Sequence, residues 1–117
     1  MIGSRRTAFP SKNSVSSEER MGQFDVHRLA DGLVLDCQSD LLSHLASRLV
    51  VPLIPKSDAP TPVRRLNPVF RIEGVDHVMM TETSAAVRTK QLGPVVASLA
   101  HRSFEIANPF DVLISGV

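Results

Sequence analysis

Hydrophobic and polar side chains alternate through the first half of the chain, which predicts β-strands. The alternation runs over residues 24–26 and again over 33–38, where one apolar face ends at Cys37 while Asp36 points the other way. Between these stretches lies Asp31-Gly32, and both residue types tolerate a positive φ. The pattern therefore predicts a β-hairpin in this region.

Later segments extend the predicted sheet. Residues 49–54 form a β-branched run that suits a central strand buried on both faces. Residues 69–72 and 77–80 flank Glu-Gly-Val-Asp, which predicts a second hairpin, and residues 86–91 predict a more polar strand. Five of the eight prolines fall within residues 52–68, so we expect a long irregular loop there.

The last quarter of the chain has a helical pattern. Apolar side chains recur at spacings of three and four from Val96 to Leu113, which predicts one face of a helix. Pro109 interrupts this stripe, and a proline there removes an amide donor and clashes with the preceding turn. We expect the helix to kink or to restart, with Asn108 as N-cap and Asp111 in the first turn.

The first 20 residues differ from the rest of the chain. They hold six Ser or Thr and scattered charges, with Phe9 as the main apolar side chain, and they lack the apolar stretch of a secretory signal. They predict a disordered extension preceding a domain over 21–117. Alternatively, Glu18-Glu19-Arg20 could be encoded by a purine-rich run resembling a bacterial ribosome-binding site, with translation starting at Met21.

Composition limits the classes of function. A chain of 117 residues has the size of one domain, and 43% hydrophobic with 21% charged residues is typical of a globular protein. The formal charge of +1 and the absence of Trp and Tyr argue against direct binding to nucleic acid. No apolar run approaches the roughly 20 residues of a membrane helix, and a lone Cys37 makes no internal disulfide. A cytoplasmic protein is expected.

Signatures of catalysis and cofactor binding are absent from the sequence. It has no Gly-rich phosphate loop, no nucleophile elbow and no paired-Cys site, so we predict no enzyme activity, no cofactor and no metal. Cys37 is predicted to lie in the core as a small hydrophobic residue. The other polar candidates are predicted to be structural or solvated: Asp36 and Asp40 on a solvated face or as loop caps, Arg64 and Arg65 in the loop, and His77 at an exposed rim.

Seven segments, in their order along the chain, resemble the CcdB family of bacterial toxins. They are QFDVH at 23–27, LDCQSDLL at 35–42, RLVVPL at 48–53, NPVFRI at 67–72, HVMMT at 77–81, SLAHR at 98–102 and ISGV at 114–117. The resemblance covers residues 21–117.

This resemblance implies a fold and an activity. The fold is α+β and mainly antiparallel, a homodimeric SH3-like small barrel with a C-terminal helix, shared with the MazF and Kid toxins. The activity is binding: such toxins bind the A subunit of DNA gyrase and trap the complex in which DNA is cleaved. A CcdA-like antitoxin neutralises them through a disordered segment that folds on the toxin.

The resemblance also transfers the family's gyrase contacts to this chain. Three are the last residues, two are an apolar pair and one lies on the terminal helix: Ser115, Gly116, Val117, Leu41, Leu42 and Asp111. Ser115 replaces a tryptophan of the family and Asp111 an asparagine, while Pro109 interrupts a helix that the family keeps continuous. Gly116 also fits a simple helix C-cap.

Two alternatives remain open. One is an endoribonuclease of the MazF and Kid type, for which Arg88 or Arg102 with His101 or Asp76 would supply the chemistry, although their spacing singles out none of them. The other is a protein that keeps the fold and binds antitoxin but no longer poisons gyrase, because Ser115 lacks the stacking area of an indole.

Overall fold

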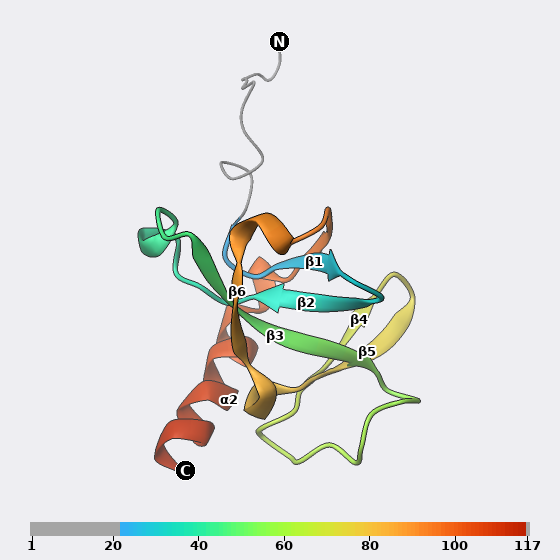
Figure 1. Cartoon of the computed structure of the whole chain (residues 1–117). Coiled ribbons are helices and arrows are strands. Elements are labelled where there is room, and N and C mark those ends of the chain that lie inside the picture. The colour runs from blue at the N-terminus through green and yellow to red at the C-terminus, as the bar shows by residue number, and fades with distance from the viewer. Residues whose placement is uncertain (1–21, 117) are drawn as a thin grey trace.

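Seven antiparallel strands form one curled sheet in the computed structural model, which describes residues 22–116 (Figure 1). The strands are β1 (Asp25–Leu29), β2 (Gly32–Asp36), β3 (Ser47–Pro55), β4 (Val69–Ile72), β5 (Val75–Met79), β6 (Ala85–Arg88) and β7 (Val95–Ser98). Their order is β4-β5-β3-β2-β1-β7, and β6 pairs with β3. A single helix, α2 (Ser103–Ser115), follows the last strand. The expected α+β fold, a small barrel-like sheet with a C-terminal helix, is confirmed.

Within residues 22–116, four single turns of 3-10 helix lie between these elements, three of them between strands and the fourth between β7 and α2. They are η1 (Asp40–Leu42), η2 (Thr81–Thr83), η3 (Thr89–Gln91) and η4 (Ala100–Arg102).

Strand β3 lies at the centre of the sheet. Its first half pairs with β6 and its second half with β5, while β2 lies along its other side. Val50 is buried on one face and Val51 and Leu53 on the other, as the β-branched run predicts, but Leu49 remains 38% exposed. The strand continues to Pro55, so the irregular loop begins after that residue and not at Pro52.

Hydrophobic residues are buried on both faces of the sheet. The larger cluster lies on the face that α2 covers and consists of Val26, Leu33, Leu35, Val51, Leu53, Phe70, Ile72, Met79, Leu99 and Ile106. A smaller cluster of Val34, Val50 and Leu92 lies on the other face. Alternate side chains of one strand point to opposite faces, so the central strands contribute to both clusters.

Both predicted hairpins form, with turns that differ from the sequence expectation. In the first, Leu29 pairs with Gly32, and the positive φ falls on Ala30 rather than on Asp31 or Gly32. In the second, Ile72 pairs with Val75, so the turn is only Glu73-Gly74, and both residues have positive φ. Two-residue turns of this kind match the twist of the strands.

The C-terminal prediction was wrong at two points. Residues 95–98 form strand β7, which pairs with β1, and helix α2 begins only at Ser103. Strand pairing here overrides a helical spacing, and Val95 and Val96 are β-branched residues that favour a strand. The helix also continues through Pro109 without a restart, so Asn108 is not an N-cap.

Candidate functional site

Four exposed leucines form the first candidate contact surface. Leu41 and Leu42, the apolar pair implied by the family resemblance, are 88% and 46% exposed on η1. Leu45, in the following loop, and Leu49, on β3, are also exposed. We call these four residues the leucine patch. Sequence analysis missed Leu45 and Leu49, although Leu45 follows Leu41 at a spacing of four. Clustered exposed apolar side chains mark an interaction surface.

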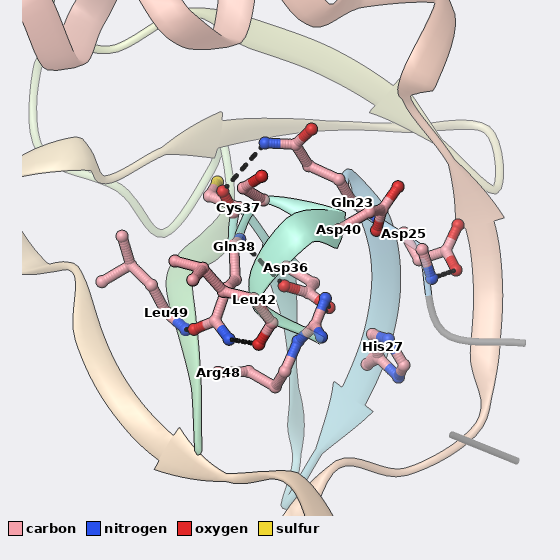
Figure 2. A network of polar contacts seen from close by, with 12 residues as sticks. Gln23, Asp25, His27, Asp36, Cys37, Gln38, Asp40, Leu42, Arg48 and Leu49 are labelled. Carbon is pink, nitrogen blue, oxygen red and sulfur yellow. Dashed lines mark hydrogen bonds and ion pairs between the residues drawn. The ribbon is translucent and has the colours of Figure 1, made fainter. Parts of the chain in front are cut away.

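A glutamine holds the leucine patch together (Figure 2). The Gln38 amide donates to the Leu42 carbonyl oxygen at 2.9 Å, and its own oxygen accepts from the Leu49 amide at 3.2 Å. This side chain therefore connects the η1 turn to β3. The Ser39 hydroxyl accepts from the Leu41 amide at 3.2 Å and caps the turn.

Beneath Gln38 lies a buried ion pair between β2 and β3 (Figure 2). Asp36 is fully buried and Arg48 is 2% exposed, with the Arg48 Nε and Nη2 atoms 2.9 and 2.7 Å from Asp36 Oδ2. The other carboxylate oxygen accepts from the backbone N–H of Gln38 at 3.0 Å. Burial raises the pKa of Asp36, and the hydrogen bonds from Arg48 and Gln38 oppose that rise.

Asp36 and Asp40, which were predicted together from the sequence, lie in different environments. The prediction of a solvated face was wrong for Asp36, because Asp36 pairs with Val50 and this register brings the buried Arg48 within reach. Asp40 is exposed, and it accepts from the backbone N–H of Gln23, which precedes β1, at 2.9 Å.

Two further side chains test the sequence predictions. Cys37 is half-buried against the larger hydrophobic cluster, as predicted, and burial together with the Asp36 charge raises the pKa of its thiol to about 12. His77 is only 7% exposed, so its placement at an exposed rim was wrong. It pairs with Phe70 on one side and Pro55 on the other, within the sheet, and its Nδ1–H donates to the Val75 carbonyl.

The end of α2 carries the second candidate contact surface. Asp111 and Ser115 are exposed, and the Ser115 hydroxyl donates to the Asp111 carbonyl at 2.6 Å. Gly116 takes a φ of +77° and closes the helix with a bond to the Val112 carbonyl, as a C-cap does. Val117 lies outside the described residues.

Two apolar residues at this helix end were not singled out from the sequence as exposed contacts. Ile114 is 84% exposed and Leu113 is 45% exposed. The sequence analysis placed Leu113 in the apolar stripe of the helix. Its exposure means that the single chain does not bury this end of the stripe.

The single chain does not bring the two surfaces together. In Figure 1 the η1 turn and the end of α2 lie apart on the same side of the molecule. A partner that touches both surfaces of one subunit must therefore be large. The resemblance implies contact residues but not this separation.

The residues considered for ribonuclease chemistry have different partners. Arg102 pairs with Glu105 and lies over the Phe70 ring, with its guanidinium carbon 4.8 Å from the ring centroid. Asp76 pairs with Arg71 at 3.3 Å on the other face of the β4–β5 hairpin. Arg88 lies on β6 and His101 on η4.

The remaining predictions concern the loop, metals, membranes and the N-terminus. Arg64 and Arg65 are exposed, as expected.

Among residues 22–116 no three His, Cys, Asp or Glu side chains gather as a metal site would require. No helix in this same range is long and apolar enough to cross a membrane. The proposed extension over 1–20 and the alternative start at Met21 lie outside the described residues.

Comparison with models of protein families matches nearly the whole described range. Residues 23–116 match the family described as CcdB protein. The matched range begins just before β1 and ends just after α2, and it includes both candidate contact surfaces except Val117.

Proposed function

This chain belongs to the CcdB family of toxin–antitoxin toxins, and we propose on that premise that it binds the A subunit of DNA gyrase and traps the cleaved-DNA complex. The observation that carries the proposal is the exposed pair Leu41 and Leu42, which the resemblance aligns with the family's contact positions and which lies on the η1 turn that Gln38 joins to β3. The proposed activity is binding, without a catalytic step.

The leucine patch can supply binding free energy. Removing a leucine side chain from water contributes about 1.5–3 kcal/mol when burial is complete. Leu41 can contribute the largest share of this free energy, because its side chain is 88% exposed before binding. Its loss should weaken gyrase binding more than the loss of any other leucine of the patch.

Ser115 lowers the binding free energy that the end of α2 can contribute to a gyrase complex. The family's indole would add on the order of 1–3 kcal/mol by stacking and burial, and a hydroxyl bonded to the Asp111 carbonyl adds little of this. We therefore propose that this toxin depends more on the leucine patch and binds gyrase about tenfold or more weakly than a member with tryptophan.

The proposed active form is a homodimer. Ile114 and Leu113 are large apolar side chains exposed on the last turn of α2, and a second copy would cover them. A dimer formed there would place two helix ends beside each other.

Induction of the full chain in a gyrase-sensitive bacterium tests the proposal. We expect growth arrest, recovery of the gyrase A subunit in a pull-down, and linear DNA in a cleavage assay with purified gyrase. Leu41→Asp should abolish all three effects, whereas Val63→Asp, an exposed valine of the loop before β4, should not. Normal growth with no gyrase binding at micromolar concentration would refute the proposal.

Ser115 favours a second candidate, a toxin fold that binds antitoxin without poisoning gyrase. The two proposals differ in one measurement. Deleting Ser115 to Val117 should weaken gyrase binding and growth arrest in a gyrase poison and change nothing in a protein that never bound gyrase, while a purified antitoxin should bind in both cases.

A further inference from the structure

A small pocket of about 240 Å³ lies between the loop before β4 and helix α2. Its lining residues are two from the loop and four from the helix: Arg65, Pro68, Glu105, Asn108, Pro109 and Val112. The four helical residues are spaced as i, i+3, i+4 and i+7, so they share one face of α2. The volume lies just below the range of about 300–1,000 Å³ that is usual for ligand pockets, and it suits a ligand the size of one amino acid.

Pro109 changes the hydrogen bonding on this face of the helix. In an α-helix the backbone N–H of one residue donates to the carbonyl four residues earlier, and proline has no such hydrogen. The Glu105 carbonyl oxygen therefore lacks its usual donor, although the helix continues through Pro109. Pro109 is buried, and both residues line the pocket. The helix side thus combines an apolar surface with a carbonyl oxygen that can accept a hydrogen bond.

Arg65 supplies a positive charge on the loop side. It is exposed, and among residues 22–116 it has no carboxylate within 4.0 Å. Its φ of +73° is a left-handed backbone conformation that arginine rarely adopts. Asn67 fixes this loop, because its side-chain oxygen accepts from the Val63 backbone N–H at 2.9 Å and its side-chain nitrogen donates to the Met79 carbonyl at 3.1 Å. Strained backbone of this kind clusters at ligand sites.

The other polar groups of the pocket are compatible with an anionic ligand. The Glu105 carboxylate pairs with Arg102, which offsets its negative charge. Asn108 is exposed, and its side-chain amide can donate to a carboxylate. The pocket therefore offers one cation, one amide and one carbonyl acceptor beside apolar side chains.

We propose that this pocket binds a small aliphatic carboxylate with an adjacent N–H, which is the chemistry of an aliphatic amino acid or of the C-terminal residue of a peptide. The carboxylate pairs with Arg65, and the N–H donates to the Glu105 carbonyl. The aliphatic chain packs on Pro68, Pro109 and Val112. A phosphate fits less well, because it would bring oxygen atoms against the Glu105 carbonyl. This site is independent of gyrase binding.

NMR titration of the isotope-labelled full chain tests the site with four probes. N-acetylvaline carries all three features, N-acetylvalinamide lacks the carboxylate, and isovalerate lacks the N–H. We expect N-acetylvaline to bind with a Kd on the order of 1 mM, isovalerate to bind more weakly and N-acetylvalinamide not to bind. Free valine identifies the source: tighter binding than N-acetylvaline indicates a free amino acid, and weaker binding indicates the end of a peptide.

Two variants test the two polar contacts. Arg65→Gln should weaken the binding of N-acetylvaline about tenfold or more, because it removes a charged hydrogen-bond donor. Arg64→Gln changes the neighbouring exposed arginine, which does not line the pocket, and should leave binding unchanged. Pro109→Ala restores a donor to the Glu105 carbonyl, so it should weaken N-acetylvaline but not isovalerate. It should not lower the Tm, since proline is unfavourable inside a helix.

Four outcomes would overturn the proposal. They are no binding of N-acetylvaline at millimolar concentration, equal binding of N-acetylvaline and N-acetylvalinamide, equal effects of Arg64→Gln and Arg65→Gln, and equal weakening of N-acetylvaline and isovalerate by Pro109→Ala. A gyrase pull-down on the same protein separates this proposal from the proposed function. If N-acetylvaline binds and gyrase does not, the pocket assignment holds and the gyrase proposal fails.

Discussion

At the scale of single residues, the buried pair of Asp36 and Arg48 determines how the leucine patch is presented. One carboxylate oxygen accepts from the guanidinium and the other from the backbone N–H of Gln38, and the Gln38 side chain in turn joins η1 to β3. The chain of contacts thus runs from a core ion pair to an exposed contact residue. A change in the core should therefore alter a surface that it does not touch.

Arg48→Ala should lower the free energy of unfolding by about 3–5 kcal/mol, because it leaves the Asp36 carboxyl buried without its cation. Urea denaturation measures this loss. The control is Arg71→Ala, which breaks the exposed pair with Asp76 and should cost less than about 1 kcal/mol. Equal losses for the two variants would show that the buried pair has no special role.

Cys37 should react slowly with thiol reagents in the native protein. Burial raises its pKa from 9.0 to about 12, so at pH 8 the thiolate fraction falls on the order of a thousandfold. Because the folded pKa is the higher one, this group's contribution to stability is complete below pH 9 and is lost as pH rises toward 12. Modification rates in native and urea-unfolded protein at pH 8 give the measurement. Similar rates in both states would contradict the prediction.

The residue-scale predictions failed where a partner is distant in the sequence. The alternation correctly places Asp36 on the face opposite Leu35, but Arg48 is twelve residues away and becomes its partner only through the register of β2 and β3. His77 was misplaced for the same reason, since pairing with two strands buries it. The alternation of hydrophobic and polar residues indicates on which face of a strand a side chain lies. The pairing of the strands in the sheet decides whether other side chains cover that face.

At the scale of elements, the junction between η3 and β7 packs closely against β1. The Gly93 amide donates to the Arg28 carbonyl at 2.7 Å, and the Gly93 carbonyl accepts from His27 Nδ1–H at 2.9 Å. A Cβ at Gly93 would lie 2.7 Å from that Arg28 oxygen. The glycine is therefore required by the close approach of two backbones.

Gly93→Ala should cost about 1–3 kcal/mol of stability, because the junction must move away from β1 and stretch both bonds. The control is Gly32→Ala, where a Cβ meets no atom within 4 Å and the change should stay within about 0.5 kcal/mol. Thermal unfolding of both variants checks the difference. A neutral Gly93→Ala would mean that this junction is loose in solution.

The elements themselves were predictable where the pattern is local. The two hairpins and the central strand follow from alternation and turn residues, whereas β7 was taken for helix because Val96 and Leu99 match a helical spacing. At Pro109 the error was the opposite one. The proline predicted a break in the helix, but it lies buried within a continuous helix. Pairing with β1 and packing against the sheet decide both cases, and neither is visible in a short window of sequence.

At the scale of the whole molecule, the exposed end of α2 leads to the last prediction. The chain should form a dimer at micromolar concentration, and Ile114→Glu should shift it to monomer, since a carboxylate buried in an apolar interface costs several kcal/mol. Val63→Glu introduces the same charge on the loop and should leave the dimer intact. Sedimentation velocity measures both.

The Ile114→Glu variant also tests whether gyrase binding requires the end of α2. Ile114 precedes Ser115 and Gly116, so a dimer formed there places four of the proposed helix-end contacts side by side, two from each copy. If Ile114→Glu is monomeric and loses gyrase, gyrase binding depends on the end of α2. A monomer that still binds gyrase would assign that contact to the leucine patch alone, and an unchanged dimer would place the interface away from α2.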